Sequence, residues 1–289
     1  MHDSSTDESL YEYEDANGKD KHTTGTEAVN NANKKHKNAA KIQQMNEMLE
    51  QSDKNTPLIN YLGATIKKGI APKSMGFVHR KDKPDQLNVQ NAYLRDDYVD
   101  AICKGLFNAP VLREVSFRNC ALNDERGLRL LGALNLNQVE SLDISYNPHL
   151  SSEFYKQLNL VNANCDAVLR KLQLEGNKVG DDNIAKLVKS LVFSNRIYYL
   201  NVSDNEITDF GARNLAILLC ECDTIRVLFV HYNRIMGRGG GEIARAIQHK
   251  DLLQVLDISY NAIGGGGKKT VSYAARNESK YPEEDEYLR

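Results

Sequence analysis

The chain has 289 residues, of which 41% are hydrophobic and 26% are charged, and its formal net charge is -2. This composition is typical of one elongated globular domain with flexible ends, and it gives no support for nucleic-acid binding. No apolar run approaches the ~18 residues of a membrane span, and the acidic N-terminus lacks a signal-peptide core. We therefore expect a protein of the cytosol or nucleus without membrane contact.

The N-terminal third is expected to contain an arm and a capping region. Residues 1–38 are rich in acids, then in lysine and asparagine, and are predicted to be disordered because they have little apolar surface to bury. Residues 39–83 are predicted to form an N-terminal helical capping region. Its first part carries an apolar stripe at helical spacing, which indicates either a loosely docked helix or a partner-binding helix. The stripe comprises Ile42, Met45, Met48 and Leu49.

A second helix is predicted to begin at Pro57, after an N-cap at Asn55 or Thr56, and to end before Gly69. We expect this helix to shield the N-terminal edge of the domain that follows. Its buried face is predicted to comprise Leu58, Ile59, Leu62 and Ile66.

The pattern L-x-x-L-x-L-x-x-N-x-L then recurs every 27 to 30 residues, clearest in two copies that begin at Ile197 and Ile225. Such a period indicates units of one strand and one helix that bury their apolar sides only by stacking. The ninth position is filled by Asn147, Asn177, Asn205, Asn233 and Asn261, with Cys120 and Ala92 in the two earlier copies. We expect the five asparagines to form a ladder that satisfies buried backbone groups.

This long period, with helices such as DFGARNLAILL, resembles the ribonuclease-inhibitor-like class of leucine-rich repeat proteins. That class also includes the Ran GTPase-activating proteins and the tropomodulin actin-capping domain. The resemblance implies an α/β fold: a right-handed leucine-rich repeat solenoid, or horseshoe, with a parallel concave β-sheet and convex helices. We assign residues 84–263 to the solenoid, with about seven repeats including a degenerate first one, and 264–289 to a C-terminal cap and polar tail.

The repeat register also explains features that resemble chemical sites. The segment GGGGKKT at 264–270 lacks the Gly-Lys-Ser/Thr order of a phosphate-binding loop, and Gly211, Gly239 and Gly267 all lie six residues after an asparagine of the ninth position. The five cysteines are scattered, and Cys220, Cys222 and His231 have the wrong spacing for zinc. We therefore expect a protein that is not an enzyme and needs no cofactor or metal.

The alternation of a strand predicts that positions 4 and 6 of each repeat point inward, whereas positions 3, 5 and 7 point to the concave side. Position 7 is filled by Arg118, Ser145, Glu175, Ser203, His231 and Ser259. Apolar and aromatic residues gather on the concave side of the last three strands. We predict that the partner-binding residues are Tyr199, Val227, Phe229, His231, Tyr232, Val255, Asp257 and Tyr260.

Two readings of these side chains stay open. They form a binding surface, or Tyr232 and Tyr260 lie flat over the asparagine turns while the C-terminal segment folds back over Phe229. The first reading predicts a monomeric protein-interaction scaffold, and family analogy suggests a cytoskeletal or ciliary assembly. The alternative function is a Ran-type small-GTPase activator, although such proteins carry a longer acidic C-terminal region than Glu283–Glu286 provides.

Overall fold

A computed structural model describes residues 57–72 and 85–264, except 108, 110, 135, 164–167, 249 and 251, together with Gln43 and Glu47. The chain divides into two units, 1–46 and 47–289, and the elements described below belong to the second. The predicted apolar stripe from Ile42 to Leu49 and the predicted cap and tail at 265–289 lie outside the described residues.

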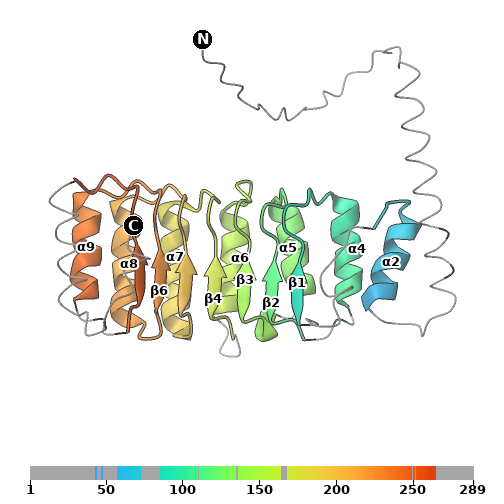
Figure 1. Ribbon diagram of the computed structural model, residues 1–289, viewed down its shortest axis with the longest axis horizontal. Helices are drawn as coiled ribbons and strands as arrows, with labels where there is room; N and C mark the ends of the chain where they lie inside the picture. The colour runs from blue at the N-terminus through green and yellow to red at the C-terminus, as the bar shows by residue number, and fades with distance from the viewer. Residues whose placement is uncertain are drawn as a thin grey trace, which may run out of the picture. The chain divides into compact units, whose positions relative to one another are not determined.

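The fold is built on one open, parallel sheet of seven strands, whose spatial order follows the chain order (Figure 1). Each strand is three residues long and pairs with the next in the register that the repeat pattern predicts, for example Leu172 with Leu200. The strands are β1 (Gln86–Asn88), β2 (Glu114–Ser116), β3 (Ser141–Asp143), β4 (Lys171–Gln173), β5 (Tyr199–Asn201), β6 (Val227–Phe229) and β7 (Val255–Asp257).

Helices connect the strands and cover one face of the sheet (Figure 1). We call the opposite side, which carries none of these helices, the strand face. The helices are α2 (Pro57–Lys67), α4 (Asp96–Leu106), α5 (Asp124–Ala133), α6 (Ser152–Asn162), α7 (Gly180–Ser194), α8 (Asp209–Glu221) and α9 (Gly237–Ile247), with a short 3₁₀ helix, η1 (Leu136–Gln138).

The core lies between the sheet and the helix layer. Leu172 and Leu174, at positions 4 and 6 of their repeat, are fully buried, and so are Leu200 and Val202 in the next repeat. The segment assigned to the degenerate first repeat contributes strand β1, which pairs in parallel with β2. The alternation expected for a strand therefore holds for positions 3 to 6 of most repeats. The exceptions are Asn201 at position 5, which is buried, and the last repeat, in which Leu256 and Ile258 are partly exposed.

The predicted asparagine ladder is present. The side-chain oxygen of Asn205 accepts hydrogen bonds from the backbone N–H groups of Asn177 (3.0 Å) and Val179 (3.1 Å) in the preceding repeat. Its amide nitrogen donates to the carbonyls of Leu174 and Ser203, each at 2.8 Å. Because the backbone turns sharply at these positions and is buried, each asparagine satisfies groups that the sheet leaves unpaired.

A second ladder, made of aspartates, was not predicted. The Asp181 carboxylate accepts hydrogen bonds from the N–H (2.8 Å) and hydroxyl (2.5 Å) of Thr208 and from the N–H of Gly211 (3.0 Å) in the following repeat. Asp209 in turn accepts from the N–H groups of Met236 and Gly239. Each aspartate thus caps the next helix, whose first N–H groups lack intrahelical partners.

The aspartate ladder explains why a glycine recurs at the start of helices α8 and α9, which the need for a turn alone does not. A Cβ atom at Gly211 would lie 2.5 Å from Asp181 Oδ1, and one at Gly239 would lie 2.5 Å from Asp209 Oδ1. Glycine therefore leaves room for the carboxylate of the preceding repeat at both positions. Gly267, the third glycine of this series, lies outside the described residues.

Two expectations were wrong. Ser145 and Ser203 at position 7 are completely buried and do not contribute to the strand face. The strands end at position 5 and the next turn enters the left-handed region at position 8, so the period-two rule no longer holds there.

The second correction concerns helix α2, whose buried face comprises Tyr61, Leu62, Ala64 and Thr65. Of the predicted set only Leu62 is fully buried, whereas Leu58, Ile59 and Ile66 are partly exposed. Helix α2 packs against α4, so the direction of that helix and not the apolar spacing alone selects which of its side chains are covered. The assignment of α2 as an edge-capping element stays a prediction.

Candidate functional site

The strand face carries a connected series of ring side chains near its C-terminal end. Ring centroids lie 5.6 Å apart for Tyr199 and Phe229, 6.3 Å for Phe229 and His231, and 5.4 Å for His231 and Tyr232. Tyr232 and Tyr260 are stacked, with centroids 4.1 Å apart and planes inclined by 4°. We call these five residues the aromatic array.

The repeat register positions the array. Tyr199 pairs in register with Val227, which pairs with Val255, so these three residues form one row across β5 to β7. In the next row Phe229 pairs with Asp257. All eight residues of the predicted site therefore lie on three neighbouring strands and the turns that follow them.

The two stacked tyrosines occupy an unusual backbone conformation. Tyr232 and Tyr260 have φ angles of 54° and 52°, in the left-handed region that large side chains seldom adopt. Their side chains are exposed by 53% and 70%. The repeat geometry thus directs the two bulky rings outward. The preceding repeat has a smaller residue, Asp204, at the same position and in the same backbone conformation.

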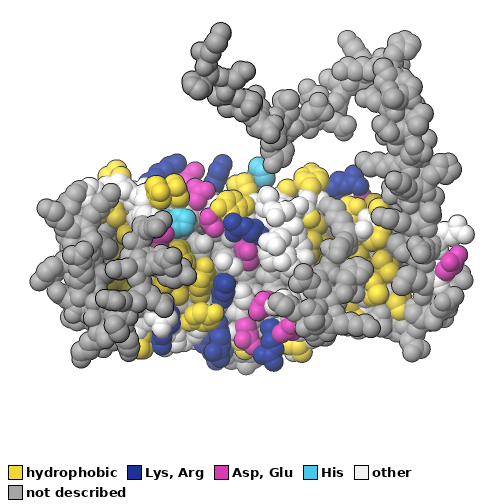
Figure 2. Space-filling model, viewed as in Figure 1, with side chains coloured by type: hydrophobic (Ala, Val, Ile, Leu, Met, Phe, Trp, Pro, Cys, Tyr) yellow, Lys and Arg dark blue, Asp and Glu magenta, His cyan; other side chains and the backbone are white. Residues whose placement is uncertain are grey.

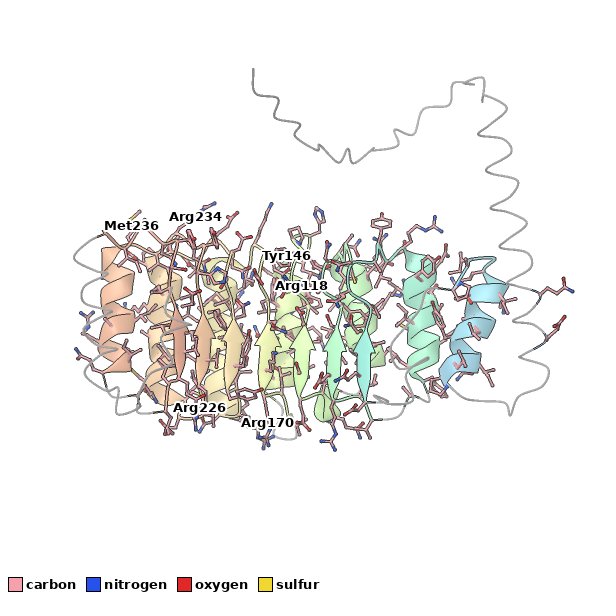
Figure 3. The ribbon with its side chains drawn as sticks, viewed as in Figure 1. Arg118, Tyr146, Arg170, Arg226, Arg234 and Met236 are labelled. Carbon is pink, nitrogen blue, oxygen red and sulfur yellow. The ribbon has the colours of Figure 1, made fainter. Side chains whose placement is uncertain are left out.

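The array reaches the edge of the sheet at which the strands end. Arg234 and Met236 lie on that edge beyond the array, whereas Arg170 and Arg226 lie at the opposite edge (Figure 3). Met236 is 60% exposed. Arg234 pairs with Glu206 at 3.4 Å. Met236 therefore extends the apolar surface toward the N-terminus of helix α9.

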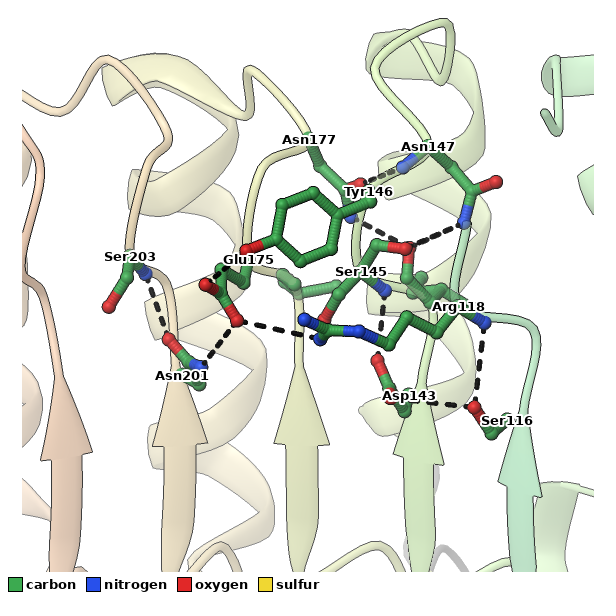
Figure 4. Close-up of polar contacts among 12 residues, drawn as sticks. Ser116, Arg118, Asp143, Ser145, Tyr146, Asn147, Glu175, Asn177, Asn201 and Ser203 are labelled. Atoms are coloured by element: carbon green, nitrogen blue, oxygen red, sulfur yellow. Dashed lines mark hydrogen bonds and ion pairs between the residues drawn. The ribbon is translucent and has the colours of Figure 1, made fainter. Parts of the chain in front are cut away.

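A polar cluster occupies the corresponding region of the N-terminal half (Figure 4). The Arg118 guanidinium lies 4.3 Å from the centre of the Tyr146 ring and forms an ion pair with Glu175 at 3.5 Å. The Tyr146 hydroxyl donates to Glu175, and the Asn201 amide donates to the same carboxylate at 3.4 Å. Charged side chains of both signs gather over this central part of the strand face (Figure 2).

Three tyrosines of the strand face, Tyr146, Tyr199 and Tyr232, have a raised pKa. Burial is the largest cause that raises the pKa of Tyr146 and of Tyr199 above the ordinary value, and the negative charge of Glu175 adds to it. A hydrogen bond with Tyr260 raises the pKa of Tyr232. The face therefore presents neutral phenols, which combine an apolar ring with a polar tip.

The described residues include no group of three or more His, Cys, Asp or Glu side chains placed to hold a metal ion. Within the same part of the chain, none of the helices is long and apolar enough to cross a membrane.

The stacked strand-helix units and their asparagine ladder define a leucine-rich repeat protein. A model of the leucine-rich repeat family matches residues 199–216 and 251–270, which carry two of the units described above. No curated protein sequence matches the chain.

Two solved structures are similar to parts of this chain. The tropomodulin C-terminal domain of Caenorhabditis elegans is 17% identical over 43% of this chain and 92% of its own length, with a TM-score of 0.33. An internalin (InlF) of Listeria monocytogenes is 16% identical over 71% of this chain and 61% of its own length, with a TM-score of 0.35.

Proposed function

We propose that this protein is a non-enzymatic interaction module that binds a protein partner on the strand face of β5 to β7. The observation that supports the proposal is the aromatic array, in which Tyr232 and Tyr260 are exposed and the other three rings are half-buried. Aromatic side chains are enriched among the few residues that dominate binding energy, and a contiguous exposed apolar patch commonly marks a contact surface. Val227 and Val255, which are half-buried, continue the row of Tyr199 across β6 and β7.

The backbone supports the same proposal. A large residue in the left-handed region costs roughly 1–3 kcal/mol. For Tyr146 the polar cluster provides a compensating intramolecular role, because its hydroxyl and ring contact Glu175 and Arg118. Tyr232 and Tyr260 are more exposed and stack mainly on each other. Retaining two such rings at unfavourable positions is best explained by a role at the surface.

The test compares partner capture from native extract by the parent, by the double variant Phe229→Ala/Tyr232→Ala, and by Phe193→Ala. Phe193 is 70% exposed on α7, in the helix layer, and is a control for general loss of apolar surface. We expect the double variant to bind a captured partner more weakly by over about 2 kcal/mol, roughly 30-fold in Kd. Phe193→Ala should bind like the parent.

Circular dichroism must first show that both variants are folded. A folded double variant that captures and binds the same partners as tightly as the parent would overturn the proposal. The cytosolic or nuclear location and the cytoskeletal or ciliary setting suggested by family analogy remain predictions, to be judged from the identity of those partners.

A further inference from the structure

The strand face already shows how its tyrosines interact with cations. Arg118 lies over the Tyr146 ring and is held there by the Glu175 carboxylate. The ammonium group of Lys171 lies 4.6 Å from the centre of the Tyr199 ring. Each of these two aromatic rings is thus paired with a cation from its own chain, and in the first case a carboxylate beside the ring completes the site.

Near the C-terminal end of the sheet, aromatic rings and carboxylates lie close together, but no cationic side chain among the described residues lies over the rings of the last two repeats. Within the described part of the chain, no lysine or arginine lies over Phe229, Tyr232 or Tyr260. Asp204 occupies position 8 beside Tyr232 and is exposed, and Asp257 pairs in register with Phe229. The nearby Arg234 is paired with Glu206, and Lys171 lies over Tyr199 at the other end of the array. Among the described residues around Phe229, Tyr232 and Tyr260, Asp204 and Asp257 therefore leave an excess of negative charge.

Ring spacing indicates the shape of a complementary ligand. Successive centroids from Tyr199 through Phe229 and His231 to Tyr232 are 5.4 to 6.3 Å apart. Alternate side chains on one side of an extended peptide are separated by about 6.6 Å, twice the rise per residue. An extended segment that runs along the array can therefore place every second side chain near a successive ring.

We propose that the aromatic array binds an extended, arginine-rich segment of a partner protein, with guanidinium groups over the rings and beside Asp204 and Asp257. This inference rests on the proposed function and specifies the chemistry of the partner. Arginine suits the site better than lysine because its planar guanidinium stacks on aromatic rings and binds carboxylates through two donors. The arrangement repeats between two molecules what Arg118, Tyr146 and Glu175 form within one.

Fluorescence anisotropy with the full chain and three labelled octapeptides, (Arg-Ser)4, (Gln-Ser)4 and (Glu-Ser)4, tests the inference at fixed ionic strength. We expect (Arg-Ser)4 to bind at least tenfold more tightly than (Gln-Ser)4, and (Glu-Ser)4 to bind more weakly still. The aromatic double variant Phe229→Ala/Tyr232→Ala should weaken binding of (Arg-Ser)4 at least tenfold.

A charge variant, Asp204→Asn/Asp257→Asn, separates charge from shape. Asparagine tolerates the left-handed conformation of Asp204 and can still accept the hydrogen bond from the Ser259 N–H that Asp257 accepts at 2.9 Å. We expect this variant to weaken binding of (Arg-Ser)4 at least fivefold. The matched control Glu221→Gln, which removes one exposed charge at the end of α8, should leave it unchanged.

Three results would overturn the inference: equal or tighter binding of (Gln-Ser)4 or (Glu-Ser)4, binding of (Arg-Ser)4 that neither double variant weakens, or no binding of any peptide. The proposed function is judged separately, by the capture of native partners. If the aromatic variant loses those partners while the peptides fail, the surface is a binding site for a partner of different chemistry.

Discussion

Arg118 and Glu175 form an ion pair at 3.5 Å although they belong to repeats that are not adjacent. Between them lies the repeat of Ser145, a small and fully buried residue at the same position. From Arg118 to Ser259, position 7 alternates between a larger residue and a serine. Because Ser145 is small, the long side chains of Arg118 and Glu175 can meet above it (Figure 4). The ion pair therefore spans three repeats, and the Asn201 amide extends the polar cluster to a fourth.

A double-mutant cycle with Arg118→Gln and Glu175→Gln measures this link. The side chains are only 33% and 18% exposed, so we expect a coupling free energy of about 1 kcal/mol in denaturant unfolding at low salt, with a smaller value at 1 M salt. The exposed pair Lys156 and Glu153, at 3.8 Å, is the control and should couple by about 0.3 kcal/mol. Equal coupling in the two pairs would contradict the structure.

The asparagine ladder leads to a larger effect. Replacing Asn205 by Leu removes four hydrogen bonds and leaves buried backbone groups of the preceding repeat unpaired. We expect the free energy of unfolding to fall by on the order of 1–3 kcal/mol. Asn214→Leu, on α8, removes one exposed hydrogen bond and should change it by less than about 0.5 kcal/mol. Thermal and urea unfolding of both variants checks this, and a parent-like Asn205→Leu would count against the ladder.

Two glycine substitutions should change the free energy of unfolding in opposite directions. In Gly211→Ala the new Cβ would lie 2.5 Å from Asp181 Oδ1 and from Ile207 Cγ2, so we expect destabilisation by about 1–3 kcal/mol. In Gly132→Ala the new Cβ meets no atom within 4 Å, and alanine favours the helix, so we expect stabilisation by about 0.5–1 kcal/mol. Urea midpoints measured side by side provide the comparison, and shifts of the same sign would refute it.

These results show which features could be predicted from the sequence. The strand register and the asparagine ladder were predictable because they depend on residues that recur at one period. The aspartate ladder was missed because Asp181 binds a different residue type, Thr208, in the next repeat. The pair of Arg118 and Glu175 was missed because two periods separate the partners and a small residue must lie between them.

The positions of the residues in the candidate site were predictable from the same repeat period. The register places the aromatic residues on three adjacent strands, and the structure brings their rings into contact. The stacked geometry of Tyr232 and Tyr260 was not predictable, because it depends on the left-handed turn at position 8, where a sequence pattern would favour glycine, asparagine or aspartate. Residues in such turns follow neither the strand nor the helix period.

The capping role of α2 is tested by two truncations. Deletion of residues 1–38 should leave the melting temperature unchanged. Deletion of residues 1–70 removes the fully buried Tyr61 and the ion pair of Lys68 with Asp100 at 2.6 Å, and it uncovers the side of α4 against which α2 packs. We expect that protein to aggregate in size-exclusion chromatography. Identical behaviour of the two truncations would remove the capping assignment.

Cysteine reactivity reports on burial in the helix layer. Burial raises the pKa of the Cys103 thiol to about 11, so at pH 8 only about one molecule in a thousand carries the reactive thiolate. Exposed Cys220 should be alkylated by iodoacetamide first, whereas buried Cys120 and Cys222 should react only on unfolding. Because the thiolate fraction of Cys103 rises with pH below its pKa, its labelling should accelerate about tenfold per pH unit. Peptide mass spectrometry measures the order of alkylation. Alkylation of Cys120 or Cys222 before Cys220 would contradict the burial that the structure gives these side chains.

The two ladders run in opposite directions along the chain. Each asparagine side-chain oxygen accepts from the repeat before it, and each aspartate of the second ladder accepts from the repeat after it. The unit of residues 205–232 carries both connections, through Asn205 and Asp209, and the unit before it carries them through Asn177 and Asp181. Duplicating residues 205–232 within the gene would insert a unit whose ends already fit, and would lengthen the sheet by roughly 4.8 Å. The length of the strand face is therefore a property that duplication or loss of whole units can change without redesign of the core.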